Sequence, residues 1–516
     1  MNSTQAPDGA NGKLLSNSRW NLLAFAASLM VNFATLPIVV AAIGLPAFGV
    51  GGLVLAIYAP FMLVGTVLGQ AMVKELAPLL LATPRRDAHA ASLLSTAIFL
   101  CVVGSIAVTA SLVALANVAM TLFDVQDDLA VDWWLAFLVA GLGWAAQQVV
   151  LVIQGSIAAT QRYAAVAQLS VVTAVVSAIC AVAGSKWMPD YRGFLIGTSA
   201  GFIISVVLWT FQARRQLPFL FPLPRVSLTD MKTIAAFGKW QGGAHFVGAV
   251  SNQIDRYLLG ILAPLAVVGQ FNIAMRLQEV VHMGLLKATE VLLPHFAVTA
   301  TDSPERRSTF FLQASWALNL LGACALAPLI PLAHSLISLW IGPEAAQGSA
   351  PMLRTLAAAG VLGCGVNVYY YFALGTGQQA RMAALTVAHA VLTIALTAAS
   401  LLLWGPVAAG AGYLGANLLR LGVSLWLTRN HFSDAMRSTQ LLQTTLPPLA
   451  IGLAIAYSAW RMDLLHPTSW WALLVQYALV ALMIGGGTAL ATCTSPSGRA
   501  LVRHSAQALR QTFRRN

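Results

Sequence analysis

Apolar stretches of about twenty residues recur along the whole chain, and they limit its fold more than any other feature. A helix of roughly 20 apolar residues spans the ~30 Å hydrocarbon core of a bilayer. Hydrophobic residues make up 58% of the 516 residues, and the mean hydropathy is +0.76. Soluble globular proteins do not have this balance. The sequence therefore predicts an all-α integral membrane protein.

Windows of high hydropathy predict about 14 transmembrane helices. They lie near 20–42, 50–72, 91–115, 133–158, 164–184, 193–211, 236–262, 267–294, 309–331, 351–374, 381–404, 408–428, 442–460 and 470–492. The connections are short, so none could hold the soluble catalytic part that membrane glycosyltransferases and polymerases usually need. A GxxxxGK[ST] motif is also absent, which argues against a nucleotide-driven pump.

Basic residues separate between the two sides of the predicted membrane. With the N-terminus inside, 21 Lys and Arg fall in inside segments and 3 in outside loops. Because cytoplasmic loops are rich in Lys and Arg, we expect both termini in the cytoplasm. The net charge of +12 then follows from topology and implies no nucleic-acid partner.

A weak internal repeat indicates two halves of like orientation. An offset of 218 superposes Gly44–Ile57 on Leu262–Met275, and six spans separate the copies. We expect two pseudo-symmetric six-helix bundles followed by a helix pair. The predicted segments are a disordered cytoplasmic tail (1–18), an N-terminal bundle (19–215), a cytoplasmic linker (216–233), a C-terminal bundle (234–430), the helix pair (440–493) and a basic amphipathic cytoplasmic tail (494–516).

The predicted span at 267–294 carries an unusual concentration of charge. Arg276, Glu279, Lys287 and Glu290 share one face of a helix that turns about 100° per residue. A charge at the bilayer centre costs about 2.5–3.5 kcal/mol, so such residues persist mainly where they face protein or water. The sequence therefore predicts a charged edge along a polar pathway.

The preceding span, 236–262, has a polar face of its own. Gln241, His245, Asn252 and Asp255 fall within about 80° on a helical wheel. A turn at Pro264 joins the two spans, so both polar faces could line one cavity. In other spans Asn32, Gln148 and Gln154 fit interhelical hydrogen bonding as well as contact with a ligand. Arg354 and Arg420 lie near predicted span ends, where long side chains can extend to the interface.

Three stretches of the chain read IGLPAFGVGGLVLAI, NQIDRYLLGILAPLAVVGQFNIAMRLQE and YYYFALGTGQQARMAALTVA. They resemble polysaccharide repeat-unit flippases of the Wzx type, in the multidrug/oligosaccharidyl-lipid/polysaccharide exporter superfamily. The resemblance implies a two-bundle transporter, not an enzyme. It would move undecaprenyl-diphosphate-linked oligosaccharide from the cytoplasmic to the periplasmic leaflet for O-antigen, capsule or exopolysaccharide assembly. The family's acidic residue in the seventh span matches Asp255.

The resemblance suggests roles for the polar residues. Arg276 and Lys287 become candidates for binding the diphosphate or acidic sugars, because guanidinium and ammonium groups bind phosphate oxygens. Asp255, Glu279 and Glu290 become candidates for ion coupling, whereas Gln241, His245, Asn252 and Asn32 would line the cavity. A structural alternative stays open, since Arg276–Glu279 and Lys287–Glu290 are i,i+3 pairs that could neutralise each other.

The expected partners are the lipid-linked glycan, anionic membrane lipids at the basic tail, and a polysaccharide polymerase with its chain-length regulator. No residue spacing suggests a metal or another cofactor. Two other functions remain as alternatives. One is a cation-coupled multidrug antiporter of the same fold, which the fixed positive charges disfavour. The other is a glycan-assembly scaffold without transport activity.

Overall fold

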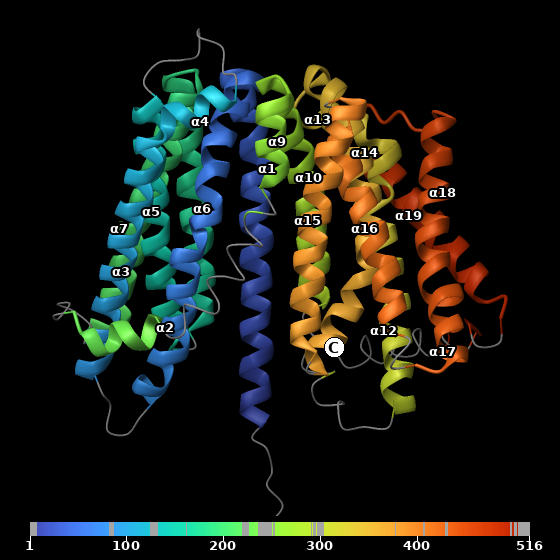
Figure 1. The fold of residues 1–516 in the computed structure, drawn as a ribbon, viewed down its shortest axis with the longest axis horizontal. Coiled ribbons are helices and arrows are strands. Elements are labelled where there is room, and N and C mark those ends of the chain that lie inside the picture. The colour runs from blue at the N-terminus through green and yellow to red at the C-terminus, as the bar shows by residue number, and fades with distance from the viewer. Residues whose placement is uncertain are drawn as a thin grey trace, which may run out of the picture. The chain divides into compact units, whose positions relative to one another are not determined.

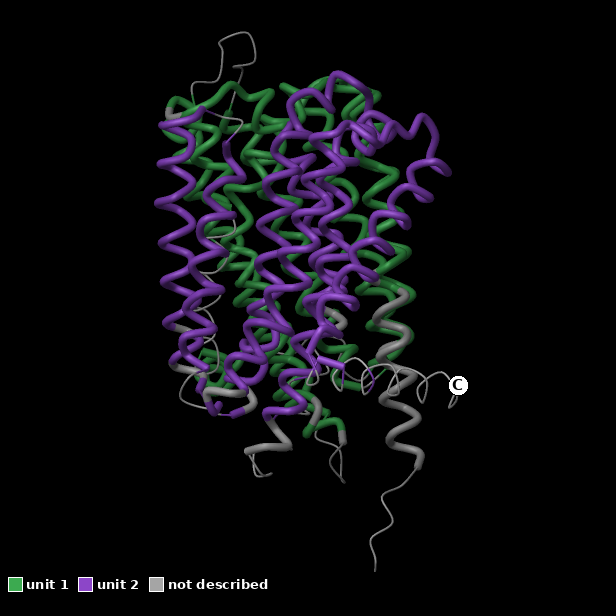
Figure 2. The backbone as a smooth tube through the Cα atoms, turned by 90° about the vertical axis from the view of Figure 1, so that its right-hand side faces the viewer, with its two compact units in different colours: residues 1–269 green, residues 270–516 purple. Residues whose placement is uncertain are grey.

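The computed structural model consists almost entirely of helices. It describes residues 8–503 apart from 82–86, 124–132, 161, 219–225, 236–249, 251–252, 290–291, 293–295, 297–303, 377, 406–407, 429–431, 496–497 and 500–502. Within these residues there is no strand, and ten helices are long and apolar enough to cross a membrane. The predicted all-α membrane fold is confirmed, whereas the number fourteen stays a prediction. The chain forms two compact units, residues 1–269 and 270–516, drawn in separate colours in Figure 2.

Unit 1 holds the helices of the first half of the chain, and its long helices run side by side (Figure 1). They are α1 (Asp8–Tyr58), the 3₁₀ turn η1 (Ala59–Met62), α2 (Leu63–Leu81), α3 (Asp87–Ala114), α4 (Ala116–Leu122), α5 (Trp133–Ala158), α6 (Tyr163–Trp187), α7 (Tyr191–Gln216), α9 (Ile254–Leu262) and the start of α10 (Leu265–Thr289). The first two predicted spans meet inside α1, where Gly44 has a φ of 77°. This left-handed conformation suits glycine and bends the chain there.

Helix α1 also begins earlier than the sequence suggests. It starts at Asp8, so helix covers part of residues 1–18, for which the sequence predicts a disordered tail. Once a helix has nucleated in an apolar span, each added residue gains a backbone hydrogen bond at little further cost. The polar residues ahead of the span can therefore continue the same helix.

Interhelical hydrogen bonds and close packing at small residues hold the helices of unit 1 together. The Gln148 side-chain oxygen accepts a hydrogen bond from the Gly65 amide at 2.9 Å, and Gln154 Nε2 donates to Ser170 Oγ at 3.4 Å. These contacts join α5 to α2 and α6, so the expected interhelical bonding is confirmed for both glutamines. A Cβ placed on Gly155 would come within 2.3 Å of the Gly69 carbonyl oxygen. Helices α2 and α5 thus approach as closely as small residues allow.

The two stretches that the offset of 218 pairs come together at the residues of both that belong to unit 1. A Cβ on Gly49 would lie 2.2 Å from the Leu265 carbonyl oxygen, and one on Gly269 would lie 2.6 Å from that of Leu45. The predicted turn is also present, since the Val267 amide donates to the Pro264 carbonyl at 2.8 Å. The Tyr257 hydroxyl donates to the Ala56 carbonyl at 2.6 Å and holds α9 against α1.

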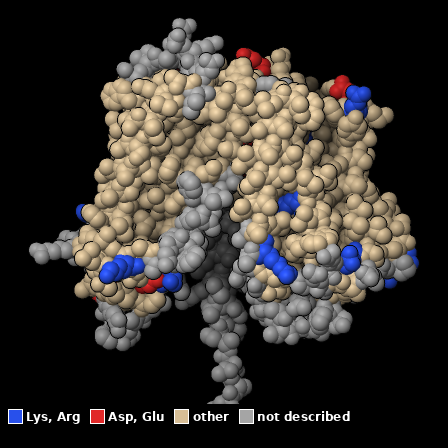
Figure 3. Space-filling model, viewed as in Figure 1, with Lys and Arg blue, Asp and Glu red and all other residues tan. Residues whose placement is uncertain are grey.

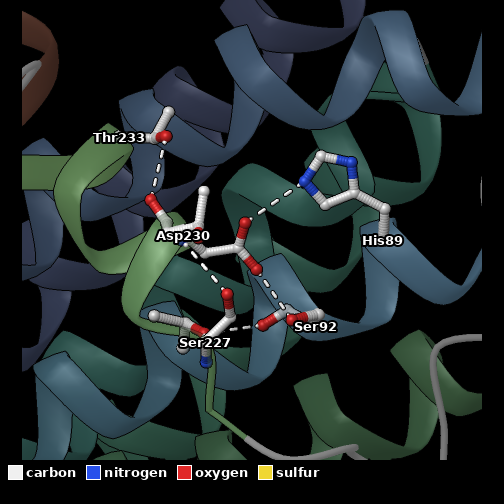
Figure 4. Close-up of polar contacts among 7 residues, drawn as sticks. His89, Ser92, Ser227, Asp230 and Thr233 are labelled. Carbon is white, nitrogen blue, oxygen red and sulfur yellow. Dashed lines mark hydrogen bonds and ion pairs between the residues drawn. The ribbon is translucent and has the colours of Figure 1, made fainter.

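A polar cluster attaches the segment after α7 to α3 (Figure 4). Asp230 is only 4% exposed and lies in a helix that covers residues 228–235. Its carboxylate accepts a hydrogen bond from Ser92 Oγ at 2.7 Å and lies 3.2 Å from His89 Nε2. The Ser227 amide donates to Thr96 Oγ1 at 3.1 Å. Part of the predicted linker at 216–233 is therefore bound to unit 1.

Unit 2 contains the remaining helices and an aromatic core. Its further helices are α12 (Pro304–Leu326), α13 (Leu329–Trp340), α14 (Pro343–Gly375), α15 (Gln379–Trp404), α16 (Ala409–Leu427), α17 (Asp434–Thr439), the π-helical turn η7 (Gln440–Thr445), α18 (Leu446–Arg461) and α19 (Trp470–Thr492). Buried Phe296, Phe311 and Phe372 pack together with Phe432. Asn319 Nδ2 donates to the Thr444 carbonyl at 2.8 Å, which attaches α12 to the turn before α18.

The surface of unit 2 has the charge distribution that a bilayer requires. On the face that Figure 3 shows, Lys and Arg gather near one end of this unit, and its middle is mostly uncharged. Large apolar side chains such as Leu402 (72% exposed), Leu482 (70% exposed) and Leu490 (75% exposed) lie on the outside. Such exposure is unfavourable in water but suits contact with lipid chains.

Candidate functional site

The charged edge predicted in the eighth span lies on α10, and packing within unit 2 determines which way it faces. Side chains on the opposite side of α10 lie against other helices of unit 2. Gln270 and Gln278 lie against Gly348 and Gly360 of α14, and Leu285 lies beside Gly322 of α12. At about 100° per residue, these three side chains project roughly 120–200° away from Arg276. Arg276 therefore points away from the rest of unit 2.

Arg276 and Glu279 form a loose ion pair in the middle of α10. Arg276 Nη1 lies 3.8 Å from Glu279 Oε2, and the two side chains are 50% and 38% exposed. This separation exceeds the 2.7–2.9 Å typical of a charge-assisted hydrogen bond. The two residues are thus paired at i,i+3, as expected if they only neutralise each other. Both side chains nevertheless stay partly exposed and are not enclosed by other side chains. A ligand with negative charge could approach the guanidinium without displacing a tight internal partner.

Of the other predicted site residues, the structure describes the side chains of Asp255 and Asn32. Asp255 lies in α9 of unit 1 and is fully buried. Asn32 uses its amide locally, because Nδ2 donates to the Ser28 carbonyl at 2.8 Å within α1. The remaining candidates, Lys287, Glu290, Gln241, His245 and Asn252, lie outside the residues whose side chains the structure describes.

A second polar group inside unit 2 was not predicted from the sequence. Arg420 of α16 lies within electrostatic range of His282 on α10, His389 on α15 and Tyr370 on α14. Its Nε is buried and has no hydrogen-bond partner among the described residues. The sequence places Arg420 near a span end, where it would extend to the interface; instead it lies among neighbouring helices. Because its neighbours come from three separate helices, no pattern within one span could reveal the group.

Comparison with known families decides the class of this chain. Residues 14–299, more than half of the 516, match the family model described as "Polysaccharide biosynthesis protein". The chain belongs to this family. The resemblance predicted from the sequence is therefore confirmed. A comparison with curated proteins gives no match for this family member.

Solved structures of transporters share the fold of this polysaccharide biosynthesis protein. The lipid II flippase MurJ in an inward closed conformation aligns with a TM-score of 0.67 at 11% identity, covering 92% of this chain and 98% of the flippase. An inward-facing multidrug resistance MATE family transporter of the MOP superfamily aligns at 0.63 and 14% identity, covering 82% and 99%. A MOP superfamily transporter from Pyrococcus furiosus aligns at 0.56 and 13% identity, covering 83% and 96%. Family and fold together place the chain among membrane transporters and flippases.

Proposed function

We propose that the chain is a flippase for undecaprenyl-diphosphate-linked oligosaccharide repeat units. It moves them from the cytoplasmic to the periplasmic leaflet for the assembly of O-antigen, capsule or exopolysaccharide. The family match supports a role in polysaccharide biosynthesis, and the likeness to a lipid II flippase supports a lipid-linked glycan as cargo. The observation that carries the proposal is the half-exposed Arg276–Glu279 pair in the middle of a membrane-length helix.

The cost of burying charge explains why this pair favours an aqueous path. Helix α10 is not among the ten helices that are apolar enough to be counted as spans, but its 25 residues make it roughly 37 Å long, enough to cross a bilayer. We propose that it crosses with its middle near the bilayer centre. Each charge in contact with hydrocarbon there costs about 2.5–3.5 kcal/mol, and a loose pair recovers little of this. Contact with water, or with the charged head of a substrate, removes that cost.

In this mechanism the glycan head crosses the membrane beside the charged edge while the lipid tail stays among the acyl chains. Arg276 binds the diphosphate through paired hydrogen bonds, and Lys287 adds a second positive charge further along the edge. The protein alternates between conformations open to either side. Ion binding at Asp255, Glu279 or Glu290 shifts their balance, provided that each ligand binds the two conformations with different affinity.

The proposed setting is the inner membrane with both termini in the cytoplasm. The basic C-terminal tail contacts anionic lipids of the inner leaflet, where each Lys or Arg contributes about 1 kcal/mol. A polysaccharide polymerase and its chain-length regulator receive the flipped repeat units on the periplasmic side.

Transport by the purified protein in liposomes tests this function directly. Undecaprenyl-diphosphate oligosaccharide is placed in both leaflets, and a glycosidase outside the vesicles removes the accessible glycan. Active flippase exposes the remaining glycan over time, whereas protein-free liposomes keep about half of it protected. Absence of flipping, together with efflux of cationic dyes by the same preparation, would favour the antiporter. Absence of both activities would favour the scaffold.

A further inference from the structure

A small polar cleft lies in unit 2, away from the edge of α10. It has a volume of about 300 Å³, and α13, α14, α18 and the chain after α18 surround it. The polar and aromatic residues that line it are His334, Ser335, Arg354, Trp460, Asp463 and His466. Pockets for small ligands begin at about this size and combine apolar surface with a few placed polar groups.

The end of α18 holds Asp463 in a conformation that an aspartate rarely adopts. Asp463 has a φ of 51° and follows the last helical turn. Its amide donates to the Trp460 carbonyl at 3.1 Å, and the next amide, of Leu464, donates to the Ala459 carbonyl at 3.2 Å. This pair of bonds is a Schellman motif, in which glycine is the usual residue at this position. An aspartate at this position places a carboxylate at the rim of the cleft, where glycine would place none.

The carboxylate of Asp463 remains available to a ligand. Its side chain is 82% exposed, and His466 Nε2 lies 3.4 Å from Oδ2. The same imidazole nitrogen lies 2.9 Å from the Asp463 carbonyl oxygen, which ties the loop back onto itself. The loop thus presents one acceptor group and one imidazole at the rim of the cleft.

Other lining residues offer donors and an aromatic ring. The Arg354 guanidinium carbon lies 5.1 Å from the centre of the Trp460 ring. Arg354 Nε is buried and has no hydrogen-bond partner among the described residues. On α13, Ser338 Oγ lies 3.5 Å from His334 Nδ1. A cation stacked on tryptophan is held in place by the ring, which leaves its N–H groups directed at whatever enters the cleft.

This set of groups fits a sugar better than an oxyanion. Hydroxyl groups both donate and accept, so a sugar can use the carboxylate, the guanidinium and the imidazoles together. A phosphate or sulfate would gain from Arg354 but would be repelled by the exposed carboxylate of Asp463. The Trp460 ring is 36% exposed and can pack against the apolar face of a pyranose.

We propose that this cleft binds one sugar residue of the glycan that the protein carries. The inference rests on the proposed flippase function, because it makes the cleft a second contact for the same cargo. Charge distribution in the sequence predicts that the end of α18 faces the periplasm. The cleft would then hold the glycan on the side where it is released.

Binding of simple sugars to the full-length protein in nanodiscs tests the cleft without requiring transport. The probes are methyl glycosides of glucose, galactose, glucuronic acid and N-acetylglucosamine, with inorganic phosphate as the anion probe. Saturation-transfer NMR measures their binding to the wild type, Asp463→Gly, Arg354→Met and Arg461→Ala. Asp463→Gly is informative because glycine suits the backbone there, so this variant keeps or raises the melting temperature while removing the carboxylate.

We expect at least one glycoside to bind the wild type and to bind Asp463→Gly and Arg354→Met about tenfold or more weakly, as the loss of a charged hydrogen-bond partner implies. Arg461 is the last residue of α18, two positions before Asp463 and outside the lining, so Arg461→Ala should bind as the wild type does. Unchanged glycoside binding by a well-folded Asp463→Gly protein would overturn the proposal. Binding of phosphate alone, or of no glycoside, would overturn it as well.

Failure of this inference can be told apart from failure of the proposed function. In the liposome assay Asp463→Gly should still flip the lipid-linked oligosaccharide, but several-fold more slowly than Arg461→Ala. Flipping at the wild-type rate by Asp463→Gly removes the role of the cleft and leaves the flippase intact. An inactive wild-type protein instead counts against the flippase, whatever the glycosides show.

Discussion

At the scale of single residues, α10 carries charged or titratable side chains in two different environments. Arg276 and Glu279 lie on its exposed side with 3.8 Å between their charged groups, whereas His282 lies on its inner side near Arg420. Arg276 can leave Glu279 and bind a substrate anion at small cost in free energy, because both side chains are already partly exposed. A buried guanidinium cannot be left unpaired so cheaply. For this reason we assign substrate contact to Arg276.

Substitution of Arg276 should affect flipping more than stability. Arg276→Ala removes the paired hydrogen bonds to a diphosphate, and we expect the flipping rate at limiting substrate to fall by about tenfold to a hundredfold. Arg276→Lys should keep part of the rate, since it retains charge but loses the fork of donors. Thermal unfolding of Arg276→Ala and Glu279→Gln is the control, because Glu279 is itself a candidate for ion coupling and both variants break the pair. A loss of flipping in Arg276→Ala that goes with an equal loss of flipping and of melting temperature in Glu279→Gln would indicate that the pair matters only for structure.

Asp230 should matter for stability rather than for transport. Asp230→Ala removes the acceptor for Ser92 and the partner of the half-exposed His89, and we expect about 1–2 kcal/mol lower stability of unit 1. Thermal unfolding in detergent measures this change. Thr233→Ala, on the exposed side of the same segment, is the control and should unfold as the wild type does. A Thr233→Ala protein as unstable as Asp230→Ala would contradict the assigned contacts.

At the scale of elements, the apolar runs predict where helices form but not how they join. The sequence places a boundary between the first two spans, and the structure has one there, because Gly44 leaves the helical conformation and divides α1 into two helical stretches. Hydropathy averages over a window and cannot detect the φ of a single glycine. The shared face of Arg276 and Glu279 on α10 was predictable, because one helical period encodes it. Lys287 and Glu290 lie outside the residues whose side chains are described, so their place on this edge stays a prediction. The group around Arg420 and the cleft after α18 were not, since residues from several helices form them.

Close packing of α2 and α5 gives a prediction at this scale. A methyl group on Gly155 would meet the Gly69 carbonyl oxygen at 2.3 Å, so Gly155→Ala forces the two helices apart. We expect a loss of about 1–3 kcal/mol, as overpacked sites usually show. Gly104→Ala is the matched control, because its Cβ would meet only Val64 Cγ1 at 3.6 Å. Equal melting temperatures for the two variants would contradict the described packing.

At the scale of the whole molecule, the charge distribution predicts which side each end faces. A cysteine introduced at Leu464, which is 62% exposed after α18, should react in intact cells with a thiol reagent that cannot cross the inner membrane. A cysteine at Thr4 should react only after the cells are opened. The labelling is compared in a background without the five native cysteines. The reverse pattern would invert the proposed direction of transport.

The central claim is that the edge of α10 borders the aqueous path of the substrate, and cysteine accessibility beside Arg276 tests it most directly. Met283 is 40% exposed and lies within about 20° of Arg276 on the helix, so Met283→Cys samples the same edge without removing the guanidinium. The account predicts fast modification by a charged methanethiosulfonate and slower modification when undecaprenyl-diphosphate oligosaccharide is bound. Leu482→Cys, at an exposed apolar position of α19, should react only with a membrane-permeant maleimide. A Met283→Cys protein that behaves like Leu482→Cys, or that the substrate does not protect, would contradict the account.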